Sequence, residues 1–265
     1  MTTLLERARN GLPLGIDIID IHGHLGRSLF TIPDVSPESL IRSMDRLGVR
    51  RIVCSHMRAW SHDAEHGNAQ MLKFMRTFPG RILGYVSVYP AAAQTVRERV
   101  ERWLAAGFIG LKLHNSNGFP YDDAAYEPAW AMADERRLPV LLHTWGAEGE
   151  FGQIRSLAGR YGGAALLLAH AGVHGEAEYV RIAEECPNVH LELASSQTPR
   201  GLVERLVAAG LTERIVWGSD ASFLNQAQQL GKVVGADIPE EAKVQILSEN
   251  PRRLLDRASK AGEKP

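Results

Sequence analysis

Cysteine and net charge are both scarce in this chain. The 265 residues include two cysteines, Cys54 and Cys186, which lie far apart in the sequence. This excludes a small secreted fold held together by disulfides and fits a reducing compartment. Basic and acidic side chains nearly balance, at 30 and 31. Because there is no positive excess to neutralise phosphates, a nucleic-acid partner is not expected.

Long hydrophobic runs are also absent. The longest purely apolar stretches, such as 164–169, have the length of a strand and are far too short to span a bilayer. Residues 1–10 lack the apolar core of a signal peptide. Hydrophobic residues nevertheless make up 45% of the chain, which is enough for one large core. We therefore expect a cytoplasmic globular protein without a membrane partner.

Short apolar runs alternate with longer helical patterns along the whole chain. The runs are nearly continuous in Val, Ile and Leu, which is typical of strands buried on both faces. Strands are predicted at 16–21, 51–55, 82–89, 108–113, 139–143, 164–170, 189–193 and 215–217. Helices are predicted at 37–47, 64–78, 94–106, 123–137, 150–161, 176–185, 200–209, 223–234 and 239–258.

The spacing of these runs predicts a single α/β domain over residues 1–265. Strands recur roughly every 22–35 residues, which is the length of one βα unit. Eight parallel strands with outer helices predict a (β/α)8 barrel over about residues 16–256, with a frayed polar tail at 258–265. A doubly wound open sheet is the alternative, although no G-x-G-x-x-G motif follows the first strand.

Polar residues gather where the predicted strands end. In a barrel of this kind the carboxyl ends of the strands form the functional rim. His22 and His24 are two residues apart, so they face the same way and form a natural half of a transition-metal site. The other strand-end residues are Lys112 and His114 on the fourth strand, His143 on the fifth, His170 on the sixth and Asp220 on the eighth.

Each of these residues alone has a simpler explanation. The H-x-H pair could be hydrogen-bonded core histidines, and Asp220 could cap the next helix. Lys112 could keep its charge in solvent at the rim or bind a substrate anion. Glu192, on the seventh strand, could face either the helices or the barrel interior. The convergence of so many candidates on one rim favours a metal centre.

The ordered set of H-x-H, G-x-K-L-H, two strand-end histidines and G-S-D resembles the amidohydrolase superfamily. The lack of a leading β-sandwich and the ending N-P-R-R-L-L at 250–255 resemble its compact amidohydrolase-2 branch. The resemblance extends from residue 17 to residue 255 and implies a divalent metal. Zinc is expected, with manganese, iron or cobalt as alternatives. The implied ligands are His22, His24, Lys112, His143, His170 and Asp220.

The segment around Lys112 is similar to the fourth-strand segment of urease. The shared stretch covers residues 106–114 and stops at Asn115, where urease continues with an acidic residue. The similarity implies that Lys112 is carbamylated and bridges two metal ions, and that His114 binds substrate. Without the carbamate, a single ion is expected, with the ligands His22, His24, His143 and Asp220.

The resemblance implies a metal-dependent hydrolase with a small-molecule substrate. A metal ion lowers the pKa of the water bound to it and so supplies hydroxide near neutral pH. Asp220 would take the proton of that water as the base, and His170 or a metal would polarise the carbonyl of an amide, ester or lactone. His56 and Arg58, after the second strand, would contact an anionic substrate group. The first alternative is a metal-dependent non-oxidative decarboxylase of a small carboxylic acid, and the second is a barrel that binds a ligand or metal without turnover. Homo-oligomerisation stays open.

Overall fold

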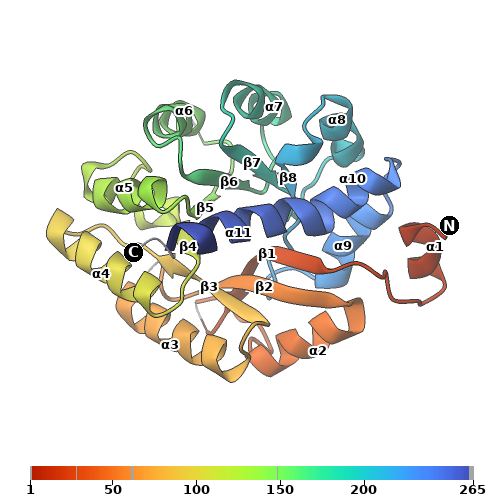
Figure 1. Ribbon diagram of the computed structural model, residues 1–265, viewed down its shortest axis with the longest axis horizontal. Helices are drawn as coiled ribbons and strands as arrows, with labels where there is room; N and C mark the ends of the chain where they lie inside the picture. The colour runs from red at the N-terminus through yellow and green to blue at the C-terminus, as the bar shows by residue number, and fades with distance from the viewer. Residues whose placement is uncertain (1, 28, 61–62, 148, 263–265) are drawn as a thin grey trace.

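The computed structural model describes residues 2–27, 29–60, 63–147 and 149–262. Eight parallel strands follow one another around the sheet in chain order, with helices outside them (Figure 1). The strands are β1 (Ile18–Leu25), β2 (Val49–His56), β3 (Ile82–Ser87), β4 (Gly110–Leu113), β5 (Pro139–His143), β6 (Ala165–Ala169), β7 (Val189–Glu192) and β8 (Ile215–Val216). The predicted (β/α)8 barrel is confirmed, and the open-sheet alternative is wrong.

Backbone hydrogen bonds between β1 and the segment that follows β8 close the barrel. The Ile21 N–H donates to the Trp217 carbonyl over 3.1 Å, and the Asp220 N–H donates to the His22 carbonyl over 2.8 Å. β8 itself is only two residues long, so these bonds attach the chain that follows it to β1. They also bring Asp220 beside His22.

The helices cover the outside of the strands, and none of those described is both long and apolar enough to cross a membrane. α2 begins after Ser36, whose hydroxyl accepts from the Ser39 N–H, and ends at Gly48 with a φ of 71°. These are the cap residues that predicted its bounds. The helices are α2 (Pro37–Leu47), α3 (Ala64–Thr77), α4 (Ala93–Ala105), α5 (Glu127–Glu135), α6 (Glu150–Arg160), α7 (Glu176–Glu185), α8 (Leu202–Ala208), α9 (Gln226–Val234), α10 (Glu240–Val244) and α11 (Asn250–Gly262).

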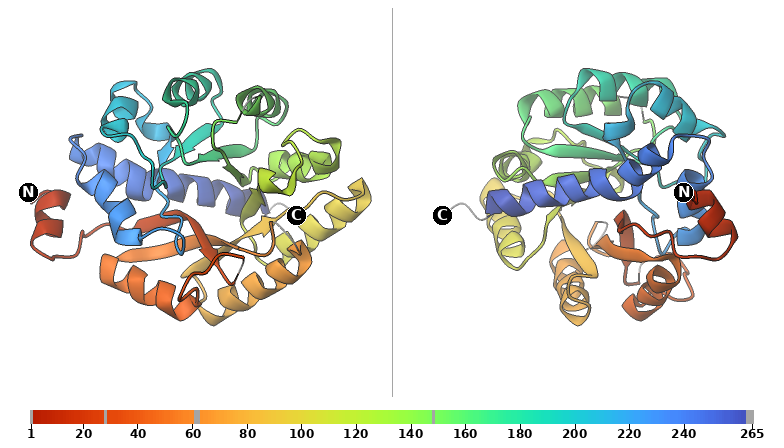
Figure 2. Two further views of the ribbon diagram at one scale, coloured as in Figure 1. Left: turned by 180° about the vertical axis from the view of Figure 1, so that it is seen from behind. Right: turned by 45° about the vertical axis from the view of Figure 1, so that its right-hand side comes forward.

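The ends of the chain differ from prediction. A short helix, α1 (Leu4–Arg9), was not predicted; Thr3 and Glu6 cap it reciprocally, and it lies beside α9, outside the ring of helices (Figure 2). The tail at 258–265 was expected to fray, but α11 continues through Gly262. Residues 263–265 lie outside the described part of the chain.

Two predicted helices are divided. The stretch 123–137 forms a 3-10 turn at Ala124–Tyr126 and then α5, and the stretch 239–258 forms α10, a π-helical turn at Gln245–Glu249 and then α11. β1 is longer than predicted and continues to Leu25. The H-x-H pair therefore lies inside β1 rather than after it.

α11 covers the end of the barrel at which the strands begin. Leu254 and Leu255 pack into the same apolar cluster as the side chains inside the barrel. The Asn250 amide donates to the Ile215 carbonyl at the start of β8, and α11 crosses the barrel in Figure 1. Because this end is closed, the site must be entered from the opposite end, where the strand-end histidines lie.

Candidate functional site

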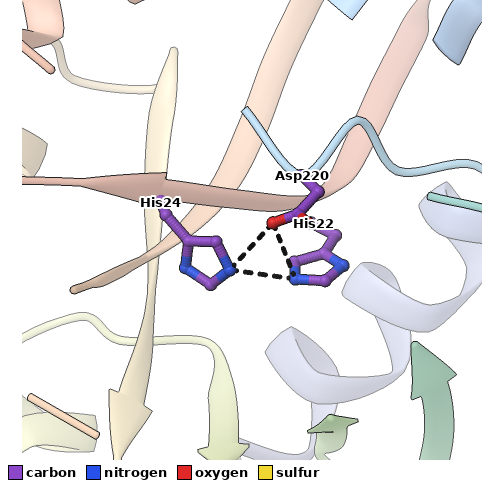
Figure 3. Close-up of side chains that lie close together, drawn as sticks. All are labelled: His22, His24 and Asp220. Atoms are coloured by element: carbon purple, nitrogen blue, oxygen red, sulfur yellow. Dashed lines mark hydrogen bonds and ion pairs between the residues drawn. The ribbon is translucent and has the colours of Figure 1, made fainter. Parts of the chain in front are cut away.

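Three of the predicted metal ligands meet at the carboxyl end of the barrel. His22 and His24 on β1 and Asp220 after β8 point toward one another (Figure 3). The two Nε2 atoms lie 3.1 Å apart, and Asp220 Oδ1 lies 3.7 Å from His22 Nε2 and 3.2 Å from His24 Nε2. Two ligands that are each about 2.1 Å from a tetrahedral zinc ion lie about 3.4 Å apart. The spacing of these three atoms therefore fits ligation of one ion.

Hydrogen bonds on the far sides of the two rings determine which nitrogens carry protons. His22 Nδ1 lies 2.9 Å from Glu192 Oε2, and His24 Nδ1 lies 2.9 Å from Ser55 Oγ. A carboxylate only accepts, so Nδ1 of His22 donates and its Nε2 presents a lone pair. When Nδ1 of His24 donates to the Ser55 hydroxyl, the lone pair on His24 Nε2 faces the lone pair on His22 Nε2. Two lone pairs and a carboxylate this close repel one another without a cation, so the donor set fits a divalent metal.

The ionisation states of the three groups agree with this assignment. Burial lowers the pKa of His22 and of His24, so both rings are neutral near pH 7. Burial alone would raise the pKa of Asp220, but the positive charge that His22 and His24 carry when protonated lowers it below its usual range. Neutral imidazoles and an ionised carboxylate are the forms that bind metals.

Glu192, whose direction the sequence leaves open, contacts the triad through His22. It is fully buried on β7 and faces the barrel interior. Besides His22, its carboxylate accepts from the His170 N–H over 3.3 Å and from the Ala194 N–H over 2.6 Å. The sequence gives one hint of this position, because Glu192 is the only carboxylate in a mostly apolar strand. Carboxylates behind ligating histidines fix the tautomer and ring orientation.

Gly218 allows this carboxylate to approach β1. A Cβ at this position would lie 2.4 Å from Glu192 Oε1 and 2.6 Å from His22 Cβ. Real Cβ atoms do not approach other atoms so closely, so only glycine fits here without displacement.

The backbone at two site residues is in a conformation that is unusual for their type. His170 has a φ of 61° and Asp220 a φ of 53°. A non-glycine residue in the left-handed region costs of order 1–3 kcal/mol, and such residues cluster at functional sites. The turns at the ends of β6 and β8 aim these side chains back over the barrel mouth.

His143 and His170 form a hydrogen-bonded pair beside the triad. His170 Nδ1 lies 2.6 Å from the Ala194 carbonyl, so this nitrogen carries a proton. Nε2 of His170 then accepts from His143 Nδ1, 3.2 Å away. His143 Nε2 keeps a free lone pair. His22, His170 and Glu192 also have possible ligand atoms within 4.8 Å of one another, but hydrogen bonds already engage most of these atoms.

Lys112 is fully buried on β4. Its Nζ has no hydrogen-bond partner among the described residues. Burial lowers its pKa to about 8, against the opposing pull of the carboxylates of Asp220 and Glu192. A neutral amine is the form that reacts with CO₂. The position therefore suits the predicted carbamate, although the carbamate itself stays a prediction.

A cavity of about 630 Å³ opens above the cluster. One wall is a column of four rings in the order Trp60, His114, His143 and Trp145, with centroids 4.4, 4.0 and 5.9 Å apart and planes within 14° of parallel. Burial lowers the pKa of His114 to about 2, so this ring is neutral. Further lining residues are His24, Leu29, Phe30, Met57, Ser116, His170, Ser195, Ser196, Asp220, Phe223 and Leu224. None of these described lining residues is Lys or Arg.

The other two predicted substrate contacts lie elsewhere. His56 and Arg58 line a neighbouring cavity of about 380 Å³, not the one above the triad. Met57 and Trp60, which alternate with them along the chain, line the first cavity. The segment after β2 therefore separates the two spaces.

Solved structures share this architecture at low identity. An uncharacterized TIM-barrel protein from Bordetella bronchiseptica has a TM-score of 0.75 at 18% identity, covering 92% of this chain and 100% of that one. A dihydroxybenzoic acid decarboxylase from Polaromonas, with bound manganese and 2-nitroresorcinol, has a TM-score of 0.73 at 16% identity, covering 91% and 97%. A probable 2-pyrone-4,6-dicarboxylic acid hydrolase from Acinetobacter baumannii has a TM-score of 0.71 at 15% identity, covering 91% and 100%. These similarities show the fold.

Sequence comparison assigns the family. No curated protein sequence matches the chain significantly. The amidohydrolase family profile, Amidohydro_2, matches residues 19–257, a range that contains every candidate ligand described above. Because the match covers nearly the whole chain, the protein belongs to the amidohydrolase family, in its amidohydrolase-2 branch.

Proposed function

We propose that this protein is a metal-dependent, non-oxidative decarboxylase of a small aromatic carboxylic acid. The cavity is the observation that supports this most. Its base is the cluster of donors, its wall is the stacked column of rings, and no described lining residue is cationic. A planar ring fits against the column with its one acidic group toward the cluster. The Polaromonas neighbour is named a decarboxylase of such an acid.

We assign the roles of the residues from the geometry of the site. Decarboxylation breaks the bond between the ring carbon and the carboxylate carbon, releases CO₂ and adds a proton to the ring carbon. A divalent ion at the triad would supply Lewis acidity there. His143 Nδ1 donates to His170 Nε2, which leaves a free lone pair on His143 Nε2 beside the cavity. We assign the proton transfer to His143, which would first take up a proton from water at the cavity mouth and then pass it to the ring carbon.

Hydrolysis of an ester, amide or lactone is the second candidate. It is favoured by the position of Asp220, whose ionised carboxylate lines the cavity beside the triad and could accept a proton from water. The Acinetobacter neighbour is named a probable hydrolase. In this reaction His170 would polarise the carbonyl, as the family resemblance implies.

One experiment separates the two candidates. Purified protein, loaded in turn with zinc and manganese, is incubated with hydroxylated benzoic acids and, separately, with aryl esters, anilides and aryl lactones. Release of CO₂ from the acids, lost on chelation and restored by metal, supports decarboxylation. Metal-dependent cleavage of the esters, anilides or lactones, without CO₂ release from the acids, would overturn decarboxylation in favour of hydrolysis. No turnover of either group by metal-loaded protein would contradict both.

We further propose that Lys112 is carbamylated and joins a second ion to the first. The orphaned Nζ and its lowered pKa support this. Protein equilibrated with ¹³C-bicarbonate and metal should show a carbamate carbon resonance, which Lys112→Ala should lack. Absence of the resonance from the metal-saturated protein would contradict the carbamate and favour a single ion at the triad.

A further inference from the structure

The neighbouring cavity contains an unusual concentration of positive charge. Arg27 and Arg58 both line it, together with His66 and the buried ring of His56. Neither arginine side chain has a hydrogen bond or ion pair with another described residue. By contrast, many surface arginines of this chain pair with a carboxylate, as in the pairs Arg81–Asp45, Arg155–Glu185 and Arg205–Glu176. The two guanidinium groups are therefore available to a ligand.

Among the described residues that line this cavity, the one carboxylate, Asp34, is already engaged. Asp34 Oδ1 accepts from the Ser36 N–H over 2.9 Å and from the Ser36 hydroxyl over 2.6 Å. Its other oxygen lies 3.6 Å from the Arg42 guanidinium. It therefore does little to neutralise Arg27 and Arg58.

His56 adds a buried donor to the wall. Its Nδ1 accepts from the Arg58 N–H over 3.2 Å, so the proton of the neutral ring is on Nε2. Nε2 faces Gly26, where a Cβ would lie only 2.0 Å away. Glycine at this lining position leaves the N–H group room.

The electrostatics agree with this description. Burial lowers the pKa of His56 to about 4, and its neighbours His66 and Arg58 add to this effect. No carboxylate of the described residues raises it again. The cavity thus has an uncompensated positive potential, which attracts anions.

We propose that this cavity is a second ligand site, distinct from the metal centre, that binds the phosphate group of a small molecule. Guanidinium groups pair with phosphate oxygens through two parallel N–H donors, and such charge-assisted bonds are the strong ones. The volume of about 380 Å³ is larger than a free phosphate needs, so the phosphate would be carried on a small organic body. This proposal is independent of the reaction at the triad.

Binding of inorganic phosphate to the metal-loaded protein tests the proposal. Titration calorimetry would compare the wild type with Arg27→Gln/Arg58→Gln. Both arginines are exposed, so the double variant should fold normally, which its thermal midpoint checks. Loss of two charge-assisted contacts should weaken binding about tenfold or more. Arg76→Gln, which removes an exposed arginine near the far end of α3, is the matched control and should bind as the wild type does.

Asp220→Asn distinguishes the two possible locations of the anion. Binding that persists in Asp220→Asn and is lost in the double arginine variant supports the proposal. Binding lost in Asp220→Asn but kept in the double variant would place the phosphate at the metal centre and overturn it. Equal binding by all four proteins, or no binding by the wild type at millimolar phosphate, would overturn it as well.

Discussion

The Nδ1 atom of His22 lies 2.9 Å from the Oε2 atom of Glu192, and this contact joins the first strand of the barrel to the seventh. Both side chains are fully buried, so the carboxylate has no water to replace its partner. The contact sets the tautomer of His22 and thereby turns Nε2 toward His24 and Asp220. The metal affinity of the triad should therefore depend on a residue that does not belong to it.

Glu192→Gln tests this dependence. The amide keeps the shape of the carboxylate but holds the imidazole proton less strongly, and its NH₂ group can face His22 instead. Loss of such a partner typically weakens metal binding about 10–100-fold. Competition with a chromogenic chelator would measure the affinity, with Glu184→Gln on the exposed face of α7 as the control. Unchanged affinity in Glu192→Gln would mean that the carboxylate serves only the fold.

Metal removal should destabilise the protein. Without a cation, the lone pairs of His22 and His24 face each other and the Asp220 carboxylate. A ligand present at about 100 times its Kd stabilises the folded state by about 2.7 kcal/mol. Dialysis against a chelator should therefore lower the thermal midpoint by several degrees, and zinc or manganese should restore it. A midpoint that is insensitive to both treatments would contradict a metal centre at the triad.

Asp220→Asn should abolish turnover and leave the fold intact. The amide nearly matches the carboxylate in volume, and the backbone bond from residue 220 to the His22 carbonyl does not involve the side chain. In decarboxylation the triad loses its charged metal ligand. In hydrolysis it also loses a general base, which typically costs roughly 10²–10⁴ in rate. Turnover and bound metal would be measured on the same sample. Near-normal kcat with a full metal complement would show that Asp220 only caps the turn.

The barrel and most of the rim were predictable because their signals are local. Continuous apolar runs set the strands, and cap residues such as Ser36 and Gly48 set the helix bounds. The orientation of Glu192 was not predictable, because a strand buried on both faces has no polar face from which to read parity.

The directions of the loop side chains were not predictable from the sequence either. His56 and Arg58 do follow a strand end, as predicted, but they turn into the neighbouring cavity while Met57 turns into the first. The left-handed backbone at His170 and Asp220 was not predictable either, because neither position holds the glycine that usually marks this conformation. These features depend on contacts between distant segments, which a single sequence does not display.

Gly218→Ala should disturb the metal centre without changing any of its ligands. The added methyl group would meet Glu192 Oε1 and the Cβ of His22, and only the carboxylate can move away. Overpacking of a buried site typically costs about 1–3 kcal/mol. We expect a lower free energy of unfolding together with weaker metal binding. Gly152→Ala, in α6, has open space around its new methyl group and should be neutral or slightly stabilising in both assays.

The buried Lys112 predicts a distinctive pH dependence of stability. Its pKa is lowered from 10.5 to about 8 in the folded chain, so between these values the unfolded state binds more protons than the folded state. Stability contributed by this group must therefore rise as the pH rises from 8 toward 10.5. Between pH 8 and pH 10 the gain is about 2 kcal/mol, at 1.36 kcal/mol per pKa unit.

Urea unfolding of chelator-treated wild type and Lys112→Met at pH 8 and pH 10 would measure this gain in stability. Tyrosine ionisation affects both proteins alike, so the gain appears as a difference between them. Parallel pH profiles for the two proteins would show that the lysine keeps an ordinary pKa, and they would remove the neutral amine on which the carbamate depends.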